Sequence, residues 1–338
     1  FFQQLYNTVD SYVVGNFVDT NALAAVGAST PVINMLVGFF MGLSAGAGVV
    51  ISQYFGGRRK EDMSKAVHSS IALTALLSVV FTVAGMLFTK PLLRAIGVPE
   101  EVLPHSSLYL TIYFAGMTFS LFYNMGSGIL RAVGDSRHPL IYLAVASLVN
   151  IALDFLFVCG FHMGIAGVAI ATIIAQAVSS AMVMYKLMHT QEDYKLELRK
   201  IHFHKKMVKK IIAFGFPAAL QQSITSFSNV IVQSYINRFG ATAMAGYSAA
   251  IRIDGFLQLP LQSFNMAITT FVGQNIGAKQ YRRVKKGIWA AWVMSSLVIL
   301  VGSVGMYFFA PYLIGVFTDD VQVIANGSGM LRIFSYAY

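Results

Sequence analysis

Charged side chains are scarce in this 338-residue chain, in which Asp, Glu, Lys and Arg together make up 11% of the residues. Soluble domains average about 25%, so too few charges are present to cover a globular surface in water. Cysteine is nearly absent as well, and the lone Cys159 excludes an internal disulfide and a cysteine-based zinc site. The motifs GxxxxGK[ST] and HExxH are missing, and we expect neither an ATP-driven pump nor an enzyme.

Hydrophobic residues, by contrast, make up 56% of the chain, and the mean hydropathy is +0.65. They gather in long uncharged runs, each at least as long as the roughly 18–20 residues that a bilayer-spanning helix needs. These runs cover residues 22–57, 69–89, 106–130, 155–185, 211–237, 255–278 and 287–318. The sequence therefore predicts an all-α polytopic membrane protein.

The pattern predicts ten helices, at about 1–17, 22–55, 64–89, 105–128, 138–159, 164–187, 207–237, 241–275, 284–309 and 321–338. The chain opens with Phe1 inside an apolar stretch, without a signal peptide. We therefore expect a fragment of a longer protein, with a truncated first helix.

The basic residues are confined largely to alternate loops. The loops at 56–66, 129–138, 186–210 and 277–287 hold 19 of the 24 Lys and Arg residues. The positive-inside rule places these loops in the cytoplasm, so we expect a multi-pass protein of the inner (cytoplasmic) membrane. The net charge of +10 is then explained by proximity to anionic lipid headgroups, and a nucleic-acid partner is not expected.

An internal repeat relates the two parts of the chain. ALAAVGAS (22–29) resembles AMAGYSAA (243–250), and SQYFGGRRKEDMSKA (52–66) resembles GQNIGAKQYRRVKKG (273–287), both at an offset of 221 residues. Six predicted helices precede the second half, which begins near residue 207, so the repeats are parallel, as in many secondary transporters. We predict two six-helix lobes, an N-lobe at 1–205 and a C-lobe at 206–338 that lacks helices eleven and twelve.

Acidic and amide side chains occur deep inside two predicted helices of the N-lobe. At 1.5 Å of rise per residue, Asp10, Asn150, Asp154 and Thr172 lie roughly 11–17 Å below the outer turns. Asn150 and Asp154 share a helix face, because they are four residues apart. Carboxylate, amide and hydroxyl oxygens at one depth suit Na⁺ or a proton. The alternative is a structural role, with Asp154 satisfied by Asn150 and the backbone.

A second polar set follows the repeat boundary: Gln221, Gln222, Arg252, Asp254 and Gln258. Arg252 and Asp254 are two residues apart on different helix faces, so a direct ion pair is not favoured. We consider two roles for this set, lining a substrate cavity with nearby Met and Phe residues, or structural pairing with other helices.

Five stretches of the chain resemble the multidrug and toxin extrusion (MATE) transporters of the bacterial DinF-like and NorM-like kind. They are NTVDSYVVG (7–15), ALAAVGAS (22–29), GIAGVAIAT (164–172), GQNIGAKQYRRV (273–284) and, most specifically, GSGILRAVGDSRHPLIYLAVASLVNIALDFLFV (126–158). The resemblance implies twelve helices in two lobes, and it implies that Asp10, Asn150, Asp154 and Thr172 form the N-lobe cation or proton site. Some NorM-like members carry acids in helices seven and ten, which are absent here, so coupling through the N-lobe is favoured.

The combined prediction is a monomeric antiporter that exports organic, cationic or amphipathic compounds in exchange for Na⁺ or H⁺. It needs no cofactor, and no metal other than a coupling Na⁺ at Asp10, Asn150, Asp154 and Thr172. Three alternatives stay open: a lipid-linked oligosaccharide flippase of the same superfamily, a membrane channel, and a membrane-embedded enzyme. Arg252 is the lone clear intramembrane cation in the first nine predicted helices, which disfavours an anionic lipid, and the short outer loops disfavour an enzyme.

Overall fold

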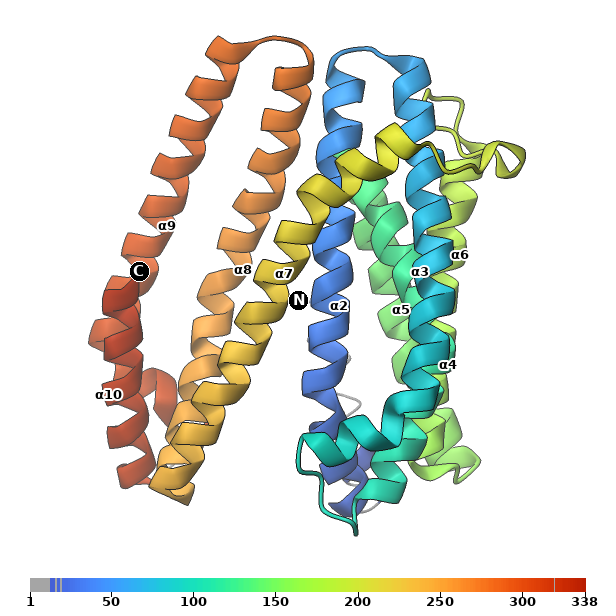
Figure 1. The fold of residues 1–338 in the computed structure, drawn as a ribbon. Helices are drawn as coiled ribbons and strands as arrows, with labels where there is room; N and C mark the ends of the chain where they lie inside the picture. Colours follow the sequence, from blue (N-terminus) through green and yellow to red (C-terminus); the bar gives the residue numbers. More distant parts are fainter. Residues whose placement is uncertain (1–12, 16, 19, 319) are drawn as a thin grey trace. The chain divides into compact units, whose positions relative to one another are not determined.

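The computed structural model describes residues 13–15, 17–18, 20–318 and 320–338, and every regular element within these ranges is helical. Figure 1 shows the long helices, which confirm the all-α prediction. They are α2 (Thr20–Gly56), α3 (Lys60–Ala95), α4 (Leu103–Ala132), α5 (Arg137–Asp154), α6 (Gly164–His189), α7 (Lys205–Ile236), α8 (Ala241–Gly277), α9 (Tyr281–Gly315) and α10 (Val321–Ala337), with short π or 3-10 turns at η1 (Phe155–Gly160), η2 (Leu198–Lys200) and η3 (Asn237–Phe239).

The chain divides into two compact units, one ending at Ser226 and the other beginning at Phe227. This boundary falls inside α7, so the first α-helical turns of α7 pack with the first unit. The predicted lobe boundary at 205/206 lies at the start of the same helix and stays a prediction.

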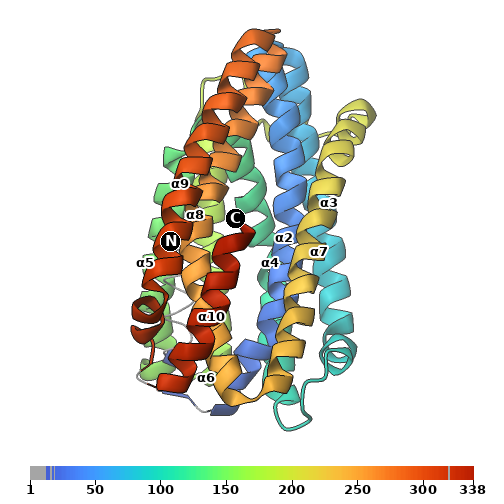
Figure 2. The same cartoon turned by 90° about the vertical axis from the view of Figure 1, so that its left-hand side faces the viewer.

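The first unit is organised around α4, which packs against α2, α3 and α6, and Figures 1 and 2 show these helices running side by side. Small residues allow the close approach. Gly116 of α4 lies directly against the Ile173 side chain of α6, and Gly126 lies against Val183 of the same helix. A side chain at either glycine would overlap its neighbour on α6. Helix packing in membranes commonly depends on small residues of this kind.

The second unit consists mainly of α8, α9 and α10, which pack on one another around Ala250, Met306, Ala310 and Leu331. Asp320 begins α10 by accepting hydrogen bonds from the backbone N–H groups of Gln322 and Val323, at 2.8 and 3.3 Å. This cap satisfies donors that have no partner inside the helix.

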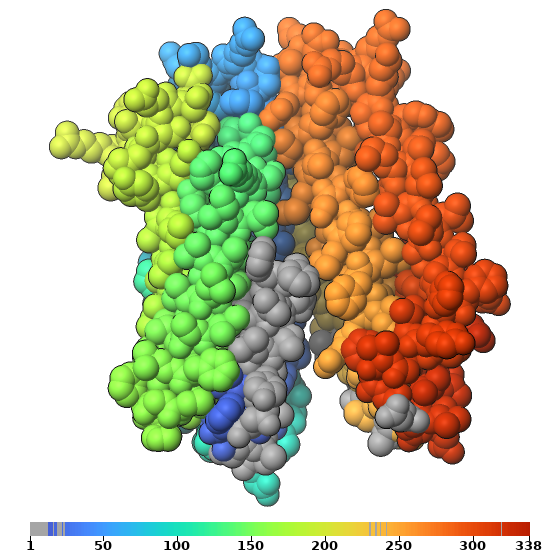
Figure 3. All heavy atoms as spheres, turned by 180° about the vertical axis from the view of Figure 1, so that it is seen from behind, coloured from blue at the N-terminus to red at the C-terminus, as the bar shows by residue number. Residues whose placement is uncertain are grey.

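Five helical segments of the described chain are long and apolar enough to cross a membrane: Ala24–Gly56, Lys60–Ala95, Arg137–Gly160, Gly164–His189 and Tyr281–Gly315. Their outer faces expose large apolar side chains, among them Leu87 and Phe88 on α3 and Val301 and Phe308 on α9. Figure 3 shows the outer surfaces of α5 and α6 in green and of α9 and α10 in orange and red. Apolar surface on this scale is typical of a face that contacts lipid.

Several helix ends differ from the sequence prediction, and two helices illustrate the reasons. α3 runs from Lys60 to Ala95 instead of 64–89, because a membrane helix continues into water, where the charged residues of its end turns are solvated. The helix predicted at 138–159 keeps α-type geometry only to Asp154 and continues as the π-helical turn η1. Single π turns inside α-helices are frequently found at functional sites.

Candidate cation site

Asn150 and Asp154 occupy the last turns of α5, within the apolar sequence LVNIALDFLFV. Asn150 is 1% exposed and Asp154 is completely buried. The structure thus confirms that the two side chains share one enclosed helix face. α5 and the η1 turn pack against α6, the helix that carries Thr172.

Thr172 lies on α6, is 6% exposed and donates its hydroxyl hydrogen to the carbonyl oxygen of Val168 at 3.0 Å. The hydroxyl oxygen keeps its acceptor lone pairs for another partner. Val168, one turn before Thr172, and Val158, one turn after Asp154, belong to the same buried apolar cluster. The Asp154 face of α5 and the Thr172 face of α6 therefore border a common core.

Asp10 lies outside the described residues. Val13 and Val14, which follow it, are fully buried members of the apolar cluster that also contains Val158 and Val168. The proposed role of Asp10 stays a prediction.

The side-chain amide of Asn150 has an unusual environment. Neither its nitrogen nor its oxygen has a hydrogen-bond partner among the described residues, although both atoms are buried. A buried polar group left without a partner costs about 1–3 kcal/mol, and an ionisable group at membrane depth adds roughly 2.5 kcal/mol or more on insertion scales. Such groups are typically retained where they bind an ion, a proton or water.

Gln176 is a site candidate that the sequence reasoning did not select. It lies one helical turn after Thr172 on α6, and its Oε1 atom is buried without a hydrogen-bond partner among the described residues. The available sequence signal was its i, i+4 spacing from Thr172 in an otherwise apolar run. Gln176 extends the row of oxygen atoms on α6 by one turn.

The second predicted set is arranged differently. Gln221 and Gln222 are exposed residues of α7 in the first unit, whereas Arg252, Asp254 and Gln258 lie on α8 in the second. Asp254 is half-buried and accepts hydrogen bonds from Gln258 Nε2 and from the Tyr338 hydroxyl, both at 2.8 Å. The bond to Tyr338, which follows α10, matches the interhelical pairing considered for Asp254. The substrate cavity stays a prediction.

The MatE family model matches residues 1–156 and 217–338, which is most of the chain. The probable multidrug resistance protein YoeA of Bacillus subtilis (strain 168) is 28% identical over 347 residues, covering 99% of this chain and 74% of that protein. An FAD transporter of Shewanella oneidensis is 25% identical, covering 98% of this chain and 74% of that protein.

Among solved structures, a MATE transporter in the bent conformation is similar, with a TM-score of 0.92 and 26% identity, covering 99% of this chain and 74% of that one. The family model, the multidrug-resistance relative and the shared fold all indicate the same family. The chain therefore belongs to the MatE family of multidrug and toxin extrusion (MATE) efflux transporters.

Proposed function

We propose that this chain is the ion-coupling part of an antiporter of the cytoplasmic membrane that exports organic, cationic or amphipathic compounds in exchange for Na⁺ or H⁺. The observation that supports this proposal is the enclosed face of α5 that bears Asn150 and Asp154, where both residues are at most 1% exposed. An ion or proton bound there offsets the unfavourable burial of these groups, so occupancy favours one conformation over another.

Exchange follows if the ion and the exported compound favour opposite conformations. A ligand shifts a conformational equilibrium only through its different affinities for the two states. Carboxylate, amide and hydroxyl oxygens are hard ligands that suit Na⁺, and a buried carboxylate also takes up a proton readily. Thr172 and Asn150 add oxygens to Asp154, and we assign Asp10 to the same site.

The test is efflux of a fluorescent organic cation from vesicles that contain the full-length protein, with pH and Na⁺ gradients imposed one at a time. We expect one gradient to drive efflux and its collapse to stop it. Efflux that is indifferent to both gradients contradicts the proposal, and an ionic current without coupling supports the channel alternative.

A second cargo class is favoured by one relative, the FAD transporter of Shewanella oneidensis. A dinucleotide carries phosphate charges, and the exposed Arg252 of α8 is a cation that would attract them. The test uses the same vesicles with FAD as the cargo. Efflux of FAD but not of the organic cation, together with loss of FAD efflux in Arg252→Gln, favours this cargo.

A further inference from the structure

Residues 190–204 connect α6 to α7 and are called the linker below. Figure 3 shows the chain beyond α6, in yellow-green, standing out at one end of the first unit. Although most of the linker is exposed, Tyr194 and Leu196 are buried in the core of the first unit. The backbone N–H of Leu196 also donates to the carbonyl oxygen of Leu187, at 2.8 Å. The linker is therefore anchored to the first unit at its middle.

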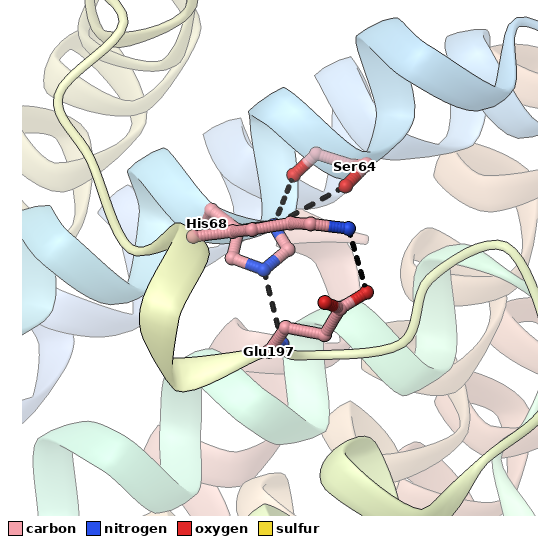
Figure 4. Close-up of polar contacts among 4 residues, drawn as sticks. Ser64, His68 and Glu197 are labelled. Atoms are coloured by element: carbon pink, nitrogen blue, oxygen red, sulfur yellow. Dashed lines mark hydrogen bonds and ion pairs between the residues drawn. The ribbon is translucent and has the colours of Figure 1, made fainter.

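A single histidine of α3 lies directly beneath this anchored stretch. His68 is 1% exposed, and Figure 4 shows its ring between Ser64 of its own helix and Glu197 of the linker. Its Nδ1 atom lies 2.7 Å from the Ser64 carbonyl oxygen, and its Nε2 atom lies 3.0 Å from the Glu197 backbone nitrogen.

These two partners fix the protonation of the ring. A carbonyl oxygen only accepts, so Nδ1 carries the hydrogen, and a backbone N–H only donates, so Nε2 is bare. Both hydrogen bonds therefore require a neutral imidazole. A second proton on Nε2 would set an N–H group against the N–H of Glu197 and place a charge in a buried position, which is unfavourable on both counts.

We propose that His68 Nε2 is a proton-binding site that holds the linker only while it is empty. The neutral ring latches the linker to α3, and uptake of a proton breaks the bond to Glu197. Imidazole is the side chain whose charge changes between about pH 5 and 8. The linker is thus latched at neutral or basic pH and released as the pH falls.

The charged groups around the ring compensate a charged imidazole only in part. Each neighbouring carboxylate has an ammonium partner: Asp193 with Lys60 at 3.1 Å, Glu61 with Lys65 at 3.7 Å, and Glu197 with Lys200 at 2.8 Å. The hydrogen bond from Lys200 lowers the pKa of Glu197, so this pair persists as the pH falls. The Glu197 carboxylate attracts a charged imidazole, which adds to the lowering of the Glu197 pKa, but this carboxylate is already paired with Lys200. A protonated His68 therefore adds a net positive charge to the group.

Two more histidines face the same space. His202 and His204 of the linker line, with His68, a cavity of about 610 Å³, and Ser69 contacts both. Its hydroxyl lies 3.3 Å from the His202 carbonyl oxygen and 3.2 Å from the His204 Nδ1 atom. Protonation of either ring adds positive charge to the cavity and so opposes a charged His68 further.

Release of the linker has a consequence for transport that depends on the proposed function. The linker joins the two predicted lobes on the face that the basic loops predict to be cytoplasmic. A released linker changes the tether between the lobes, so acidification of the cytoplasm alters export through a proton site separate from Asp154.

The test is hydrogen exchange of the linker amides in the full-length protein in nanodiscs, at about pH 5.5 and about pH 8, corrected for intrinsic rates. We expect protection at the Glu197 amide to fall roughly tenfold at the lower pH, which corresponds to the loss of one hydrogen bond. Equal protection at both pH values in the unaltered protein overturns the proposal, and this comparison needs no variant.

His68→Gln sharpens the assignment, because its amide oxygen takes the place of Nε2 as an acceptor and is not protonated in this range. We expect its linker to be protected at both pH values. The matched control is His189→Gln, a change at an exposed histidine at the end of α6, which should keep the normal pH response. If the pH response is unchanged in His68→Gln, the response belongs to His202 or His204, and the proposed role of His68 is overturned. Since the readout is exchange, the result is independent of whether the protein proves to be an antiporter.

Discussion

The two units each carry a carboxylate and an amide one helical turn apart, and the two pairs behave differently. On α5, Asn150 and Asp154 are enclosed, and the amide has no hydrogen-bond partner among the described residues. On α8, Gln258 is exposed and donates directly to the Asp254 carboxylate, which also receives the Tyr338 hydroxyl.

The difference is one of unused binding capacity. In the α8 pair, the donors of Gln258 and Tyr338 satisfy the carboxylate, so the pair is complete without a ligand. In the α5 pair, the Asn150 side-chain amide is buried and its atoms make no hydrogen bond among the described residues. Burying such a group without a partner costs about 1–3 kcal/mol. A carboxylate and an amide at the same spacing thus form a structural contact in one unit and a candidate ion site in the other.

The largest expected contrast is between Asp154→Asn and Asp254→Asn. Asp154→Asn removes the charge that the coupled ion neutralises, so gradient-driven efflux from vesicles should fall to the level of empty vesicles. Asp254→Asn removes a charge that other side chains already satisfy, so the response to the gradient should persist.

Glu101→Gln, at an exposed acid in the turn before α4, is the control for loss of a negative charge alone. Normal gradient-driven efflux in Asp154→Asn, at an expression level equal to wild type, breaks the comparison. Equal loss in Asp154→Asn and Asp254→Asn also breaks it, because both units would then take part in coupling.

A smaller contrast is expected for the two amides. Asn150→Leu should weaken the dependence of efflux on the coupling ion roughly tenfold, which corresponds to the loss of one ion–oxygen contact of about 1.4 kcal/mol. It should also leave the thermal stability unchanged or higher, because an unsatisfied buried amide is removed.

Gln258→Leu removes an exposed hydrogen bond, so both the ion dependence and the stability should change little, by at most about 1 kcal/mol. A large loss of stability in Asn150→Leu, with intact coupling, would instead mark Asn150 as a structural residue. Thermal melting and efflux measured on the same preparations separate these outcomes.

The sequence predicted the helices and the Asn150–Asp154 face because both depend on local patterns. Uncharged runs set the helix positions, and an i, i+4 spacing places two side chains on one face whatever surrounds the helix. The structure confirms that Asn150, Asp154 and Thr172 are buried, at the positions that were selected from the helical rise per residue.

The remaining features depend on contacts between distant residues. His68 and Glu197 are 129 positions apart, and nothing in the composition of either segment marks the ring as buried. The hydrogen bond from Tyr338 to Asp254 spans 84 positions and could not be predicted for the same reason. The π-helical turn after Asp154 has no recognisable signal in FLFVCG, so a continuous α-helix was the natural prediction.

The most direct measurement is the affinity of the full-length protein for an organic cation as the concentration of Na⁺ or H⁺ is raised. If the enclosed α5 face takes up the ion and favours the opposite conformation, affinity for the cation falls as the ion is added, and Asp154→Asn abolishes that dependence. An affinity that is the same at every ion concentration, or a dependence that survives in Asp154→Asn, contradicts the account.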